Sequence, residues 1–252
     1  MHTQVLTDGL SLCAASIQGS RVRQEDYYIC KQKEGRTIAV VCDGMGGMGS
    51  GNIASRFAAE QMAEALEKVK LTESMHSFWK QELERLDDGV FGLRDSSGVR
   101  LKAGTTMVAV LLQDGKLHWF SVGDSRLFFM REHRLHCVTR EHNYALLAEE
   151  KSCEKKGEQL ISYLGMGAAE LFDGSNASFM TRRGDKLLLC TDGLSRTLPQ
   201  EKIVDIMDNG KNPEAVCDDF REALEAKKYT GQDNATWVII SVDSAAVLSL
   251  RG

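Results

Sequence analysis

The chain has 252 residues, of which 42% are hydrophobic and 27% are charged, a balance typical of a soluble globular protein. This length allows one large domain or two small ones, and it supplies enough apolar residues for a substantial core. The formal net charge of −5 counts against a nucleic-acid-binding protein, because such a protein needs clustered Lys and Arg side chains.

The first half of the chain is predicted to begin with strands and to continue with two helices. Apolar runs predict strands at residues 10–17, 27–31 and 37–42. Apolar residues then recur on one helical face over 52–69, and a second helix is expected over 72–86 with Thr72 as its N-cap. Residues 90–102 are polar and contain glycine, which indicates an exposed loop.

The second half is predicted to be richer in strands. Apolar runs predict them at residues 105–112, 117–122, 127–130, 135–138, 186–190 and 235–242. The Asp–Gly pair at 114–115 gives the first two strands the pattern of a hairpin. One helix is expected over 143–155. A second is expected to begin after Thr197, with Thr197 as its cap and Pro199 in its first turn, and a third runs from Asn212 to about residue 226.

The order of these elements predicts the fold class. Strands that mostly follow one another in sequence favour antiparallel sheets, and two pairs of helices could cover two sheet faces. The pattern alone therefore predicts an α+β sandwich. No repeat or proline-rich linker divides the chain, which holds only two prolines, so residues 1–252 are expected to form a single domain.

The cysteines and the apolar runs exclude other classes. The seven cysteines include no Cys-x-x-Cys pair, so zinc-site spacing is absent, and Cys42 and Cys190 lie in apolar runs as buried small side chains would. No apolar run approaches the roughly 20 residues of a membrane span, and the first residues lack a signal-peptide pattern. We therefore expect a cytoplasmic protein that does not bind a membrane.

Two of the six Asp–Gly pairs in the chain differ from ordinary turns. Asp–Gly is a common turn signal, but Asp43 and Asp192 each follow a wholly apolar strand, and no second strand is expected directly after either. Glycines at 44, 46, 47, 49 and 51 follow Asp43 and allow a ligand to approach the main chain. A buried carboxylate is unfavourable unless a positive charge meets it, and a metal ion is the simplest such charge.

Asp124 and Asp233 stand in the same kind of position as Asp43 and Asp192. Asp124 follows a predicted strand, and Asp233 precedes the last one. If the four strand ends converge at one rim, they form an all-oxygen site of the kind that suits Mg²⁺ or Mn²⁺. Several carboxylates in one cluster repel one another strongly, which favours more than one ion.

Six short pieces in this order identify a resemblance. They are Gly19-Ser20-Arg21 with Glu25-Asp26, residues 43–47, residues 104–106, residues 123–126, residues 191–194 and residues 231–236. Together they resemble the metal-dependent protein serine/threonine phosphatases of the protein phosphatase 2C (PPM) family, especially its bacterial members, over residues 19–242. The resemblance implies a four-layer αββα sandwich, in which two antiparallel sheets pack face to face and pairs of helices flank them.

The resemblance also implies a metal site. It implies that Asp43 bridges two Mn²⁺ or Mg²⁺ ions, that the Gly44 carbonyl binds one of them, and that Asp192 and Asp233 hold the first ion. It further implies that Asp124, together with Asp192, forms the third-ion site seen in bacterial relatives. Two close ions can generate hydroxide from a bridging water at neutral pH, and that hydroxide would attack the phosphorus of a phosphoserine or phosphothreonine.

Four further residues are implied around the ions. Arg21 matches the arginine that grips the substrate phosphate, where it is expected to stand across the phosphate from the metals. Glu25 would act through bound water, while Asp26 and Asn234 would support the residues that hold the ions. Taken alone, Arg21 reads more simply as a surface residue, Asp26 as a partner of a backbone turn, and Asp124 as the cap of the following turn.

The chain departs from the family pattern at three places. Met45 stands where many eukaryotic members carry a histidine, their proposed general acid, and methionine cannot donate a proton. Glu141 replaces the aspartate of a bacterial Thr-x-Asp-His pattern, and His142 beside it reads as a structural or surface histidine. The segment near 143–162 is shorter than the mobile flap of bacterial relatives, so a short flap is expected.

Two other functions remain open on the sequence. A pseudophosphatase would be a binding module on the same fold, although known examples lose metal aspartates that are retained here. A two-metal hydrolase of nucleotides or other phosphoesters is the second alternative, although the chain lacks basic or aromatic stripes. A phosphatase of this family would act on phosphorylated proteins, which would be the targets of a serine/threonine kinase. The enzyme itself is expected to be a monomer.

Overall fold

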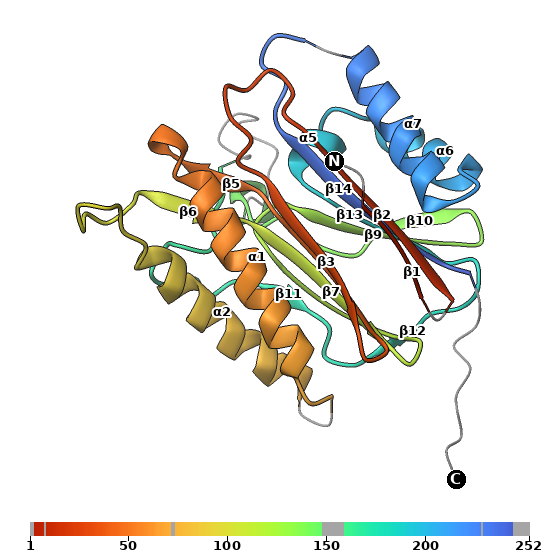
Figure 1. Cartoon of the computed structure of the whole chain (residues 1–252), viewed down its shortest axis with the longest axis horizontal. Helices are drawn as coiled ribbons and strands as arrows, with labels where there is room; N and C mark the ends of the chain where they lie inside the picture. The colour runs from red at the N-terminus through yellow and green to blue at the C-terminus, as the bar shows by residue number, and fades with distance from the viewer. Residues whose placement is uncertain (1–2, 8, 72–73, 148–158, 228, 244–252) are drawn as a thin grey trace.

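The computed structural model describes residues 3–7, 9–71, 74–147, 159–227 and 229–243. Two antiparallel sheets pack face to face, with α1 and α2 on the outer face of one sheet and α6 and α7 on the outer face of the other (Figure 1). This arrangement confirms the predicted α+β fold with four layers in the order αββα. None of the helices in the described ranges is long and apolar enough to cross a membrane.

The first sheet has six strands in the spatial order β1-β2-β14-β13-β9-β10. Their bounds are Thr3–Thr7 (β1), Leu10–Ile17 (β2), Ala235–Val242 (β14), Lys186–Cys190 (β13), Arg126–Arg131 (β9) and Arg134–Cys137 (β10). The last strand among the described residues, β14, lies inside the sheet between β2 and β13. The two ends of the chain's described part are therefore joined by direct strand pairing.

The second sheet runs β11-β8-β7-β4-β3, and β12 also pairs with β8. The bounds are Asp173–Gly174 (β11), Lys116–Val122 (β8), Met107–Gln113 (β7), Arg36–Cys42 (β4), Tyr27–Lys33 (β3) and Phe179–Met180 (β12). The hairpin predicted around residues 114–115 is present, with Gln113 opposite Lys116. A separate two-stranded ribbon joins β5 (Gly44–Gly46) to β6 (Ala103–Thr105).

Two pairs of long helices and three short helical turns accompany the sheets in the described residues. The helices are α1 (Gly51–Lys68), α2 (Met75–Phe91), α6 (Gln200–Asn209) and α7 (Pro213–Ala226), with short turns η1 (Gly47–Gly49), α3 (Tyr144–Leu147) and α5 (Asp192–Ser195). The sequence predicted a helix from Asn212, and the side chain of Asn212 caps α7 by accepting a hydrogen bond from the Ala215 amide.

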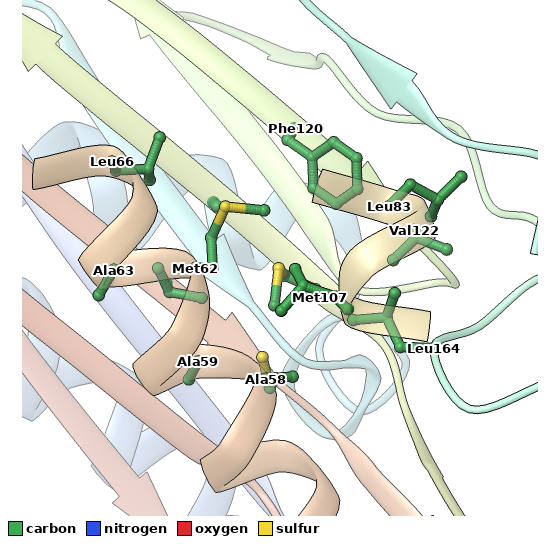
Figure 2. Close-up of a cluster of buried hydrophobic side chains, with 14 of the residues drawn as sticks. Ala58, Ala59, Met62, Ala63, Leu66, Leu83, Met107, Phe120, Val122 and Leu164 are labelled. Atoms are coloured by element: carbon green, nitrogen blue, oxygen red, sulfur yellow. The ribbon is translucent and has the colours of Figure 1, made fainter. Parts of the chain in front are cut away.

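Three apolar layers hold the four structural layers together. One lies between α1, α2 and the second sheet, one lies between the two sheets, and one lies between the first sheet and α6 and α7. Figure 2 shows the first of these, where Met62 and small residues of α1 face Met107 and Phe120 of the second sheet. Small side chains such as Ala58 and Ala59 let the helix approach the sheet closely. Cys42 and Cys190 are fully buried, as predicted.

Several predicted boundaries are wrong. Helix α2 begins at Met75, with Ser74 as its cap, whereas Thr72 lies outside the described residues. Pro199 occupies the cap position of α6 instead of its first turn, so Thr197 is not the cap. Of the helix expected over 143–155, the structure describes residues 144–147 as helical, and 148–158 lie outside the described part.

A further prediction that differs from the structure concerns the glycine loop after Asp43. No strand was expected after Asp43, but Gly44–Gly46 pairs with Ala103–Thr105 as a short ribbon. The error has a physical cause, since a run of glycines gives no apolar alternation, and the pairing depends on a segment about sixty residues away.

Candidate functional site

The four aspartates singled out in the sequence lie at one rim of the sandwich. Asp192 follows β13 after one intervening residue, whereas Asp124 and Asp233 shortly precede β9 and β14. Because β13 is antiparallel to both neighbours, Cys190 pairs with Arg126 on one side and with Trp237 on the other. The end of β13 therefore meets the beginnings of β9 and β14 at the same edge.

Asp43 enters this rim from the second sheet and is the electrostatic centre of the group. Burial raises its pKa well above the usual value, and the charges of Asp26, Asp192, Asp124 and Asp233 raise it further, in that order. Such mutual effects require the carboxylates to be close together. The structure thus brings together the carboxylates that the sequence could only suppose to converge.

Hydrogen bonds from two neighbouring threonines fix the backbone of Asp43. Its carbonyl accepts hydrogen bonds from the Thr106 amide (2.9 Å) and from Thr105 Oγ1 (2.8 Å). Its amide donates to Thr106 Oγ1 (3.1 Å), and that hydroxyl also bonds the Ser125 hydroxyl (2.7 Å). The sequence placed these residues in the shared motifs, but it did not show that they hold Asp43 in position.

Gly44 is required by the close approach of three backbone segments. A Cβ on Gly44 would lie 2.2 Å from the Gly51 carbonyl oxygen and 2.5 Å from the carbonyl oxygen of Glu25. The Glu25 side chain in turn accepts a hydrogen bond from the Gly51 amide at 3.2 Å. Glycine at both positions therefore allows β5, the start of α1 and the Glu25 segment to meet directly under Asp43.

Asp26 is buried beneath the cluster. Its Oδ2 accepts a hydrogen bond from Thr191 Oγ1 at 2.9 Å, whereas its Oδ1 has no hydrogen-bond partner among the described residues. Burial raises the pKa of Asp26 to about 7, and the charges of Asp192 and Asp233 add to that increase. Its bond to Thr191 of the opposite sheet argues against a role confined to a local turn.

Asn234 fastens the loop that carries Arg21 and Glu25. Its side-chain amide nitrogen donates to the carbonyls of Gln18 (2.8 Å) and Arg23 (3.0 Å), and its Oδ1 accepts from the Glu25 amide (2.8 Å). One buried side chain at the start of β14 thus satisfies three backbone groups of a loop near the other end of the chain.

Arg21 lies against one of the aspartates. Its Nη2 donates to Asp233 Oδ2 at 2.5 Å, and the two side chains are 56% and 37% exposed. The expectation that Arg21 stands across a phosphate, apart from the metal-binding aspartates, differs from this arrangement. Two opposite charges with exposed ends at the same rim attract each other, and that attraction accounts for the contact.

Arg196 is a residue of the site that sequence reasoning missed. It contacts Asp124 Oδ2 through Nη2 (2.8 Å) and Asp192 Oδ2 through Nε (3.2 Å). Burial and the charge of Asp192 raise the pKa of Asp124 to about 6, while the charge of Arg196 acts against that increase. The only sequence signal was the spacing of four residues between Asp192 and Arg196, which a helical turn brings together.

Comparison with known proteins decides the family. The family model described as Protein phosphatase 2C matches residues 14–227, which is most of the chain. The chain belongs to the protein phosphatase 2C family. The match ends before residues 231–236, so the place of Asp233 and Asn234 in the site rests on the structure described above.

Relatives of this phosphatase include bacterial enzymes of similar length. The serine/threonine phosphatase stp of Listeria welshimeri is 25% identical over 223 residues, which cover 84% of this chain and 87% of the relative. The serine/threonine phosphatase of S. agalactiae has the same fold, with a TM-score of 0.78, 20% identity and coverage of 93% and 100%. A structure of the PstP catalytic domain, which contains 2 manganese ions, gives a TM-score of 0.77 at 22% identity, covering 93% and 99%.

The residues of this phosphatase fit divalent ions chemically. The donors are carboxylates and a backbone carbonyl, and Asp192 Oδ1 is buried without a hydrogen-bond partner among the described residues. Across the described part of the chain, no three His, Cys, Asp or Glu side chains already enclose an ion position. Asp233 and Asp124 point at Arg21 and Arg196 instead, so metal binding would involve side-chain rotation at this rim.

His142 is a structural residue in the phosphatase, in line with the simpler reading of the sequence. It is fully buried, its Nδ1 accepts a hydrogen bond from the Gly123 amide at 3.1 Å, and its Nε2 lies 3.7 Å from Asp173. Burial raises the pKa of Asp173, but the nearby His142 ring and the hydrogen bonds from Arg140 outweigh burial and leave that pKa below its usual value. Glu141 forms an ion pair with Arg126 next to the site.

Proposed function

We propose that this phosphatase hydrolyses phosphoserine and phosphothreonine on proteins with two divalent ions, Mn²⁺ or Mg²⁺. Asp43, Asp192, Asp233 and the Gly44 carbonyl would hold the ions. The observation that carries the proposal is the group of carboxylates around Asp43, of which Asp26 and Asp124 are buried and whose like charges oppose the ionisation of Asp43. The 2 manganese ions of the PstP catalytic domain, which shares the fold, support the same number here.

The ions, when bound, would supply a nucleophile from water at neutral pH and neutralise charge on the phosphoryl oxygens. The residues of the chain then have separate tasks. Asp43 follows β4 at the rim, close to carboxylates carried by the other sheet, so one carboxylate would serve both ions. Glu25 and Asp26 would orient water and ligands beneath it, in line with their contacts to Gly51 and Thr191.

Arg21 is proposed to bind the substrate phosphate. Its side chain is the more exposed partner of its pair with Asp233, so its guanidinium can turn toward a ligand in front of the rim. A planar fork of donors matches two phosphate oxygens. Met45 lies in β5 beside the site but carries no transferable proton, so it does not protonate the departing serine or threonine oxygen.

The two alternative functions find less support. A pseudophosphatase would not need the full group of aspartates, and all of them are present and brought together here. A hydrolase of nucleotides would need a surface for base or sugar, and the family match instead favours phosphorylated proteins. We further propose that the substrates are targets of a serine/threonine kinase, and that the enzyme is a cytoplasmic monomer without membrane contact.

A substrate and metal assay tests the proposal. We expect hydrolysis of a phosphothreonine peptide to require added Mn²⁺ or Mg²⁺ and to stop after exhaustive chelation. The same preparation should act far more slowly on a nucleotide of equal concentration. Full activity after chelation would contradict the metal assignment, and a preference for the nucleotide would favour the phosphoester hydrolase.

A further inference from the structure

Arg196 is placed by a single helical turn. Asp192 opens α5 and Arg196 closes it, with the Arg196 amide donating to the Asp192 carbonyl at 2.8 Å. Side chains four residues apart lie on the same face of a helical turn. The local structure that delivers Asp192 to the rim therefore delivers a permanent positive charge next to it.

The guanidinium of Arg196 spans two carboxylates that come from different strands. It lies 2.8 Å from Asp124 Oδ2 and 3.2 Å from Asp192 Oδ2. The side chains of Asp124 and Asp192 are only 7% and 16% exposed, whereas that of Arg196 is 34% exposed. The arginine thus reaches from the surface to a carboxylate pair that is mostly buried.

This position is the one where the family resemblance implies a third ion. A divalent cation between Asp124 and Asp192 would compete for these two carboxylates with the guanidinium that already contacts one oxygen of each, and the two positive charges would repel each other. Asp192 still has its other oxygen for the proposed metal pair, because Oδ1 is buried and has no hydrogen-bond partner among the described residues.

We propose that Arg196 is a built-in cation that takes the place of a third divalent ion between Asp124 and Asp192. The site then holds two ions, and Asp124 serves to anchor Arg196 and not to bind metal. This assignment rests on the proposed metal-dependent function, and it names a residue that decides how many ions the site accepts.

Mn²⁺ binding tests the assignment. Isothermal titration and elemental analysis of the full chain should count two Mn²⁺ ions in the wild type and in Asp124→Asn. Arg196→Met keeps a side chain of moderate length without the charge, so it should gain a third, weaker Mn²⁺ site. Adding Asp124→Asn to Arg196→Met should remove that third site again.

A matched control separates this role from that of an ordinary ion pair. Arg56 and Glu60 form another pair four residues apart, but at 65% and 43% exposure on α1. Arg56→Met should therefore leave two Mn²⁺ sites and an unchanged Mn²⁺ titration. A third site in this variant as well would overturn the assignment, because it would show that losing any surface arginine creates one.

The remaining outcomes are also decisive. Three Mn²⁺ ions in the wild type, with one lost in Asp124→Asn, would overturn the assignment while leaving the phosphatase function intact. Two ions in both the wild type and Arg196→Met would overturn it as well. If Arg196→Met does not fold, the wild type and Asp124→Asn still decide, since each must retain two sites. No Mn²⁺ binding at all would contradict the proposed function itself.

Discussion

Individual residues at the rim show how a cluster of like charges is accommodated. Asp233 and Asp124 each form an ion pair with an arginine, whereas Asp43 and Asp26 have raised pKa values and form no ion pair within the described part of the chain. Arginine thus compensates two of the aspartates, and Asp43 and Asp26 are left for another positive charge. Substitutions in the two groups should therefore have different consequences.

Replacing Asp43 with asparagine should nearly abolish turnover while the chain still folds. The change removes the one charge that is proposed to serve both ions, and a loss of several kcal/mol in transition-state stabilisation corresponds to a rate loss on the order of a thousandfold or more. Steady-state kinetics on a phosphothreonine peptide measure the loss. Asp114→Asn is the matched control, because Asp114 also precedes a glycine but lies in an exposed hairpin turn. Near-normal turnover in Asp43→Asn would remove Asp43 from the centre of the site.

Replacing Arg21 with lysine should keep the charge and lose the planar fork. We expect KM to rise and kcat to fall, with a combined loss of about 1–3 kcal/mol in kcat/KM, the usual range for a charge-assisted hydrogen bond. Kinetics on para-nitrophenyl phosphate and on a phosphopeptide would measure both constants, with Mn²⁺ titration alongside because Arg21 contacts Asp233. Arg183→Lys is the control, because Arg183 is an exposed arginine that lies shortly before the start of β13. Wild-type constants in Arg21→Lys and Arg21→Ala would exclude Arg21 from phosphate binding.

At the scale of elements, helix α2 is connected to the site through hydrogen bonds of its buried Asp87. Asp87 of α2 is buried and accepts hydrogen bonds from three backbone amides, those of Gly165 (2.6 Å), Gly167 (3.3 Å) and Ala169 (2.9 Å). Leu164, at the start of that loop, exchanges backbone hydrogen bonds with Thr105, and Thr105 bonds the Asp43 carbonyl. A continuous set of contacts therefore joins α2 to the centre of the site.

Asp87→Asn should destabilise the fold by about 2 kcal/mol, since the side-chain amide cannot accept all the hydrogen bonds that the carboxylate accepts, and buried amides lose their partners. Urea unfolding would measure the change. Asp88→Asn at the neighbouring exposed position should leave the free energy of unfolding nearly unchanged. Equal stability of the two variants would show that the loop does not depend on Asp87.

The elements also show how far the sequence could predict this molecule. Most of the strands, the helix pairs and the strand-end positions of Asp43 and Asp192 were predictable, because apolar periodicity is a local property, whereas the strands β1, β11 and β12 were not predicted. The β5–β6 ribbon, the Asp87 contacts and the place of Arg196 were not, because each depends on segments that are distant in sequence. Arg196 illustrates the limit, since its spacing to Asp192 was visible but its contact with Asp124 required the β13–β9 pairing.

For the whole molecule, the buried carboxylates predict how stability depends on pH. Burial raises the pKa of Asp26 to about 7 and that of Asp124 to about 6, both above the value of about 3.9 expected in an unfolded chain. The folded state therefore binds more protons between these values, and stability falls as the pH rises through that window. In the presence of a chelator, the free energy of unfolding should be larger near about pH 5 than near about pH 8, by on the order of a few kcal/mol.

Urea unfolding at the two pH values would measure this difference, and added Mn²⁺ should restore stability at the higher pH by binding the ionised carboxylates. Asp26→Asn should flatten the pH dependence, because it removes the buried group with the higher of the two pKa values. A chelated protein that became steadily more stable from the lower to the higher pH would contradict this account.

The position of β14 has a consequence for the newly made chain. Synthesis proceeds from the N-terminus, yet this last strand inserts between β2 and β13, and Asp233 and Asn234 stand at its start. A chain that stops before β14 leaves two open strand edges facing each other, which are prone to pair with other molecules. It also lacks a proposed metal ligand and the side chain that fastens the Arg21 loop. We therefore expect an unfinished copy to be both aggregation-prone and inactive, because the open strand edges appear together with the loss of the proposed ligand Asp233 and of the loop contacts of Asn234.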